Sequence, residues 1–201
     1  ILKKGFNVAK FGDKFYLEGG IMKILYIICF FISLQNLSYS QELVIGEERV
    51  KPGIIFIFEG AIKDHIMPEE MHLKENVSNI HIEARVNWDN KDIPEGTPAG
   101  GFVPYLSINA KIINTKTGLS TFIDLVPHIN LIDNFHYARN IALPGKVDDR
   151  YDIEFNILGP TVKELALHKD WFEKYGPDFL DSVKFNYTNV DFEKIANASR
   201  N

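Results

Sequence analysis

The sequence contains a single cysteine, Cys29, in a chain of 201 residues. One thiol cannot form a disulfide within the chain, and it cannot build a structural zinc site of the Cys-rich type. A metal site in this protein must therefore use imidazole, carboxylate or thioether ligands. All six histidines lie within residues 41–201, together with Met67 and Met71. Copper and iron are transition metals that suit such ligands.

The chain also has few basic residues. It carries 22 Lys and Arg against 27 Asp and Glu, a formal net charge of −5. Five of the lysines lie before residue 41, so the remainder is more acidic still. No run of basic residues is present that could contact phosphates, which argues against nucleic acid as a partner. No Ser-His-Asp signature, phosphate loop or zinc-protease helix is present either, so the sequence does not predict an enzyme.

The chain lacks an apolar run long enough to span a bilayer, which needs roughly 20 residues. Its main apolar run, Ile24–Leu34, follows Met22-Lys23 and precedes Ser38-Tyr39-Ser40, which has small residues where a signal peptidase recognises its substrate. We therefore predict a secretory signal peptide at 22–40, cleaved after Ser40, and an exported, non-cytoplasmic protein. A retained N-terminal anchor is the alternative.

The sequence begins with Ile1, and its first methionine is Met22. We predict that translation begins there and that residues 1–21 are an untranslated upstream segment. The codons of Glu18-Gly19-Gly20 can supply a purine-rich ribosome-binding stretch at the right distance. Residues 41–201 are then a single domain, long enough to bury a hydrophobic core.

Alternation of apolar and polar residues with a period of two dominates this domain. In Ile80–Trp88, for example, His81 and Glu83 share one face while Ile82 and Ala84 share the other. Further strands are expected at Ile54–Ile62, Tyr105–Ile112, Leu119–Val126, 151–157 and 183–187, with weaker candidates at 43–50 and 136–143. Asn114–Gly118 reads as a hairpin turn. Seven or eight short strands joined by turns predict an all-β fold, an antiparallel β-sandwich.

Two long segments do not alternate: Lys63–Asn79 and Gly159–Leu180. Loops of that length in a compact domain are usually functional. A short helical turn is expected at Lys169–Tyr175, and the polar tail from Glu193 is expected to fray.

His81 and Glu83 are two residues apart on one predicted strand, so both side chains leave the same face. They can share one metal, or the carboxylate can orient the imidazole. An ordinary polar pair on a solvated face is the alternative interpretation. Taken singly, His128, His136 and His168 lie at loop edges or in loops and define no site.

The segment 65–72, His-Ile-Met-Pro-Glu-Glu-Met-His, is dense in potential ligands, Met67 and Met71 among them. A solvated loop whose two methionines pack into the core is the alternative. The residues alone therefore make a metal site a hypothesis.

Several stretches, in order, resemble the periplasmic iron-transport family of copper-containing β-sandwich proteins, which includes a spirochaete membrane antigen. The resembling stretches are Ile80–Ala84, Val103–Ile108, Asn114–Gly118, Phe135–Ile141 and His168–Asp170. The resemblance spans about residues 55–192. It implies an immunoglobulin-like sandwich, a homodimer, and a copper or iron ion as cofactor.

The resemblance also implies metal ligands: His81, Glu83, His136 and His168, with a methionine. The family's methionine-containing stretch resembles Phe122–Val126, which contains no methionine. His128, Met67 and Met71 are the candidates to replace it. A histidine in that place would favour Cu(II), iron or zinc over Cu(I), because thioether is the softer ligand.

The function implied is a periplasmic copper- or iron-binding protein that assists high-affinity iron uptake through an inner-membrane permease. Two alternatives remain open. One is an exported binding or adhesion module without metal, whose contact residues would be Trp171, Phe172 and Tyr175. The other is a metal-dependent oxidase.

Overall fold

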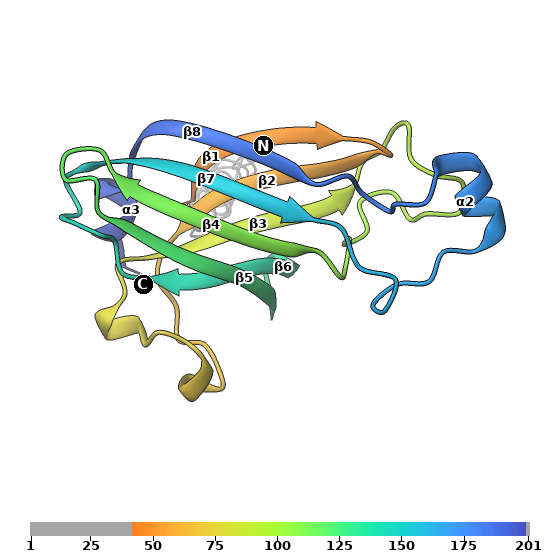
Figure 1. Cartoon of the computed structure of the whole chain (residues 1–201). Coiled ribbons are helices and arrows are strands. Elements are labelled where there is room, and N and C mark those ends of the chain that lie inside the picture. The colour runs from red at the N-terminus through yellow and green to blue at the C-terminus, as the bar shows by residue number, and fades with distance from the viewer. Residues whose placement is uncertain (1–41, 200–201) are drawn as a thin grey trace, which may run out of the picture. The chain divides into compact units, whose positions relative to one another are not determined.

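Figure 1 shows the computed structural model, which describes residues 42–199. The predicted segments 1–21 and 22–40 lie outside the described residues. The strands are β1 (Leu43–Val50), β2 (Ile54–Ala61), β3 (Ile80–Trp88), β4 (Ser107–Asn114), β5 (Ser120–Asn130), β6 (Asn134–Ile141), β7 (Arg150–Leu158) and β8 (Val183–Asp191). The helices are short: the 3-10 turns η1 (Glu69–Met71) and η2 (Glu75–Val77), then α2 (Lys169–Tyr175) and α3 (Glu193–Ala196). None of the helices within residues 42–199 has the length and apolar character needed to cross a membrane.

The eight strands form one antiparallel sheet in the order β1-β2-β3-β6-β5-β4-β7-β8. β5 pairs with both β6 and β4, so it joins the two layers of a sandwich into a nearly closed barrel. The outer strands β1 and β8 meet where the Tyr187 hydroxyl donates to Glu48 Oε1 at 3.1 Å. Gly46 makes room for this contact, because a Cβ there would lie 2.2 Å from the Tyr187 ring. The predicted all-β antiparallel sandwich is confirmed.

The core lies between the layers and consists of the apolar half of each alternating strand. Phe58 of β2 and Phe155 of β7 stack at its centre, with ring centroids 4.0 Å apart, and both are fully buried. Tyr137 of β6 is also buried, and its hydroxyl donates to the Val103 carbonyl at 2.9 Å. Because every second residue of a strand is committed to this core, the residues between them are left for the outer face.

Several observed bounds differ from the predicted ones; β8, for example, continues to Asp191, past the predicted 183–187. β4 begins at Ser107 because Tyr105 has φ +66°, a left-handed conformation that interrupts a strand. β5 extends to Asn130, since backbone pairing with β6 continues past the point where apolar alternation ends. The predicted fraying from Glu193 is wrong, because α3 forms there and buries Ile195. The predicted helical turn Lys169–Tyr175 is confirmed as α2.

Candidate metal centre

Four polar side chains predicted as ligands lie on three neighbouring strands. His81 and Glu83 come from β3, His136 from β6 and His128 from β5. In the sheet β6 lies between β3 and β5, and His128 stands directly opposite His136. His81, Glu83 and His136 alternate with core residues such as Ile82 and Tyr137, and His128 shares their face because it pairs directly with His136. The sheet itself therefore brings these side chains together.

The three imidazoles form a compact cluster. His81, His128 and His136 each offer a ligand nitrogen, and these nitrogens all lie within 4.8 Å of one another. Their ring centroids are 5.4 Å apart for His81 and His128, 5.9 Å for His128 and His136, and 6.4 Å for His81 and His136. An ion bound at about 2.0–2.1 Å from each nitrogen needs nitrogens within roughly 4 Å of each other. Small ring movements are enough to reach that spacing.

Hydrogen bonds fix which nitrogen of two rings faces the cluster. His81 Nδ1 donates to Asn140 Oδ1 at 2.8 Å, and His136 Nδ1 donates to the Asn134 carbonyl at 3.1 Å. We assign these tautomers from their partners, since a carbonyl oxygen can only accept. The lone pair of each ring is then on Nε2. A hydrogen-bonded outer nitrogen is the usual arrangement of a metal-binding histidine.

The carboxylate side of the cluster is buried. Glu83 is 3% exposed, and its Oε1 lies 3.7 Å from His81 Nε2. Glu59 stands opposite Glu83 on β2 and receives a hydrogen bond from Arg85 at 2.6 Å. Arg85 therefore compensates Glu59 directly. Among the described residues, Glu83 Oε2 is buried without a hydrogen-bond partner.

The surroundings disfavour a charge on His128, His136 and Glu83 in the metal-free protein. Burial, reinforced by neighbouring imidazoles, lowers the pKa of His128 to about 3, and burial also lowers the pKa of His136. Burial raises the pKa of Glu83 to about 8, and the nearby acids Asp133 and Glu42 add to the rise. Neutral imidazole is the form that binds metal, so the histidines need not lose a proton first.

The segment 62–79, here called the cover segment, is held against this face by residues of β6. Asn140 Nδ2 donates to the Asp64 carbonyl at 2.6 Å and to the Leu73 carbonyl at 3.0 Å. The segment also carries His72, whose ring lies 5.2 Å from that of His128 in an edge-on contact. Sequence reasoning flagged the 65–72 stretch but did not name His72 as a ligand. It also missed Asn140, although period-two alternation from His136 places Asn140 on the same face.

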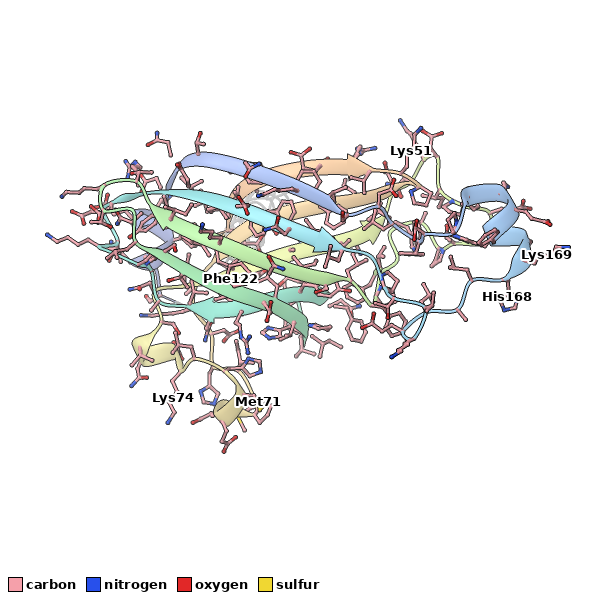
Figure 2. The ribbon with its side chains drawn as sticks, in the orientation of Figure 1. Lys51, Met71, Lys74, Phe122, His168 and Lys169 are labelled. Carbon is pink, nitrogen blue, oxygen red and sulfur yellow. The ribbon has the colours of Figure 1, made fainter. Side chains whose placement is uncertain are left out.

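The other predicted ligands lie elsewhere. Met67 and Met71 are 70% and 66% exposed, so the methionines of the cover segment do not pack into the core. His168 is exposed and precedes α2. Figure 2 shows His168 beside α2, well away from Met71 and Lys74 of the cover segment. Within one chain the structure therefore does not bring His168 to the cluster.

The aromatic residues of α2, candidates for a binding surface, are partly engaged in packing. Trp171 stacks on Phe179 with centroids 5.8 Å apart and contacts Tyr175 at 4.8 Å. Phe172 is 53% exposed. Of these three side chains only Phe172 is well exposed, so they do not form a broad aromatic contact surface.

Comparison with known proteins agrees with the fold, and two of the similar structures are of copper-containing P19. A copper-bound variant of P19 from Campylobacter jejuni, with isoleucine in place of one methionine, is 27% identical, with a TM-score of 0.63 over 74% of this chain and 96% of that chain. Copper-reconstituted P19 is 26% identical, with a TM-score of 0.62 over 73% and 94% of the two chains. FetP of uropathogenic Escherichia coli, recombinantly expressed in the periplasm, is 20% identical, with a TM-score of 0.59 over 75% and 97%, and supports the fold alone. Comparison with curated protein sequences gives no match.

The sequence pattern of one family covers most of the domain. The family described as Fe2+ transport protein matches residues 39–194, which include all eight strands and every histidine of the chain. The chain belongs to the Fe2+ transport protein family.

Proposed function

We propose that this is a periplasmic protein that binds copper, iron or both and assists high-affinity Fe2+ uptake through an inner-membrane permease. The observation that carries the proposal is the cluster of His81, His128 and His136, with ligand nitrogens within 4.8 Å of one another. Three imidazoles gathered on three strands offer three nitrogen donors at one place. They are well suited to a transition metal.

Unsatisfied polar atoms support a metal at this place. Among the described residues, His128 Nε2 and Glu83 Oε2 are buried without hydrogen-bond partners. Buried polar atoms of this kind cost about 1–3 kcal/mol each when they stay unpaired. A metal ion would satisfy both, and the donor set of three imidazoles and one carboxylate fits copper or iron. Copper, when bound, supplies one-electron redox chemistry beside the iron that the protein helps to import.

The chain's own residues prepare the site. Asn140 and the Asn134 carbonyl hold His81 and His136 in the tautomer that turns Nε2 to the cluster. Glu83 is protonated near neutral pH in the metal-free protein, so metal binding should release its proton. We propose a carrier in preference to an enzyme.

Metal loading tests the function directly. The purified protein, loaded with copper, iron, manganese or zinc in turn and dialysed, should retain about one copper or iron ion per chain. A His81→Ala/His136→Ala double variant should lose it, because two of three imidazoles are gone. His65→Ala is the matched control, since His65 is exposed and its Nε2 lies 3.3 Å from Glu69 Oε1, in the same segment. Equal metal content in wild type and double variant, or none in either, would favour the exported binding module without metal.

We also propose a homodimer in which His168 of one copy reaches the cluster of the other. The support is the exposed position of His168 beside α2, away from the cover segment of its own chain (Figure 2). In a two-fold symmetric dimer with the two chains antiparallel, the His168 end of each copy can lie beside the histidine cluster of the other. The dimer would then complete the ligand set that the family resemblance implies.

Complementation between variants tests the dimer. His168→Ala alone should lower copper affinity by at least the roughly 10- to 100-fold that losing a hydrogen-bond partner of a ligand costs, because a ligand itself is removed. Mixing it with the His81→Ala/His136→Ala variant should restore tight binding, because one intact cluster then meets one intact His168. Light scattering should give twice the chain mass. A monomer, or a mixture that binds no better than its parts, would contradict the proposal.

A further inference from the structure

His72 occupies an unusual position for a loop histidine. It follows η1 in the cover segment, and its ring contacts the His128 ring edge-on with centroids 5.2 Å apart. Its Nδ1 is buried and has no hydrogen-bond partner within the described part of the chain. His65, seven residues earlier, is exposed and pairs with Glu69. The two histidines of one segment therefore have different surroundings, and only His72 faces the cluster.

Hydrogen bonds from β6 hold the backbone on both sides of His72. Arg139 Nη2 donates to the Met71 carbonyl at 3.2 Å, and Asn140 Nδ2 donates to the Leu73 carbonyl at 3.0 Å. Figure 2 shows Met71 and Lys74 on the same projecting segment. The sheet therefore fixes the backbone carbonyl before His72 and the one after it, and so limits where the ring can lie.

Simple packing does not account for this arrangement. The ring contacts that of His128, and the Met71 carbonyl beside it accepts a hydrogen bond from the cation Arg139. A neutral imidazole with a buried nitrogen left unpaired is unfavourable by the same 1–3 kcal/mol as any unsatisfied polar group. His128 Nε2 is also buried and without a hydrogen-bond partner among the described residues. Two neighbouring imidazoles with such nitrogens are what a metal site without its ion would contain.

We infer that His72 is a further metal ligand, so that binding draws the cover segment onto the ion held by His81, His128 and His136. The inference rests on the proposed function and adds a residue and a movement to it. Hydrogen bonds to β6 already hold the backbone of the cover segment, and coordination of the ion by His72 adds a further bond between the segment and the sheet. A site with this many imidazoles favours Cu(II) over Cu(I).

Spectroscopy on the copper-loaded protein tests the inference. In wild type labelled with ¹⁵N-histidine, the Cu(II) electron paramagnetic resonance spectrum should show one more coupled imidazole than in His72→Ala, and copper affinity should be 10- to 100-fold higher. Copper should also slow amide hydrogen exchange in residues 62–79 of the wild type, and of the His65→Ala control, but not of His72→Ala.

A second variant separates ligation from folding. His72→Gln keeps a polar side chain of similar reach, and it should match His72→Ala in the copper spectrum while it unfolds at the wild-type temperature without metal. Wild-type spectra, affinity and exchange in both variants would overturn the role of His72 while leaving the proposed function intact. A wild-type protein that retains no metal would overturn both.

Discussion

Exchanging His128 for methionine is expected to raise the reduction potential of bound copper. His128 stands opposite His136 and lies in the cluster, in the part of the chain where the family resemblance implies a methionine. Thioether is softer than imidazole, so methionine stabilises Cu(I) relative to Cu(II). We expect the ratio of Cu(I) to Cu(II) affinity to rise about 10- to 100-fold, a shift of about 60–120 mV for one electron. Competition titrations with Cu(I) and Cu(II) chelators measure the ratio.

Two further variants serve as comparisons for His128→Met. His128→Ala should weaken both oxidation states, because the position then offers no donor. His65→Met should change neither, since His65 is exposed outside the cluster. An unchanged affinity ratio in His128→Met would mean that His128 does not touch the ion, in spite of its place among the three imidazoles.

Glu83→Gln is expected to stabilise the metal-free fold at alkaline pH while weakening metal binding. The pKa of Glu83 is raised to about 8 by burial, then by the charges of Asp133, Glu42 and Glu59. The folded state therefore holds more protons than the unfolded state between about pH 4.5 and pH 8. In this window the free energy of unfolding of the wild type should fall as pH rises. Glutamine has no charge to bury, so the variant should lack this loss.

The expected difference is on the order of 2 kcal/mol at pH 9 and close to zero at pH 5, measured by urea unfolding of chelator-treated protein. Copper affinity of the same variant should drop about 10- to 100-fold. Glu47→Gln, an exposed position on β1, is the control and should alter neither quantity. A variant less stable than wild type at pH 9 would show that Glu83 is held as a charged, well-solvated group.

His128 has a separate effect on the free energy of unfolding at acid pH. The pKa of His128 is lowered to about 3, first by burial. Between about pH 3 and pH 6.5 the unfolded state therefore binds more protons, and stability should fall as pH falls. Glu83→Gln should leave this contribution of His128 in place, since it removes only the Glu83 contribution above about pH 4.5. His128→Met should remove this contribution, because the methionine cannot take up a proton.

Period-two alternation was enough to predict the fold, because a half-buried strand shows its two faces directly in its sequence. The same alternation placed His81 and Glu83 on one outward face, and short turn signals located the hairpin at Asn114. The N-terminal and C-terminal limits of β4 and β5 were less accurate. They depend on a left-handed residue, Tyr105, and on pairing that continues through polar residues.

The assembled site was harder to predict, since it depends on register between strands. His128 meets His136 only because the β5–β6 hairpin closes at Asn130 and Asn134, and no local pattern specifies that length. His72 lies in a segment with no periodicity, so nothing in the sequence shows which way its ring points. The position of His168 depends on where the long connection to α2 runs, which sequence alone does not determine.

The alternation of these strands has a consequence for how such a protein can change over time. His81, Glu83, His128 and His136 all occupy outward positions, while neighbours such as Ile82 and Tyr137 build the interior. Selection can therefore act on the ligands and on the interior almost independently. A lineage can trade methionine for histidine, or gain a histidine in the cover segment, without disturbing the packing that keeps the barrel folded. Metal preference is then free to drift or adapt while the architecture persists.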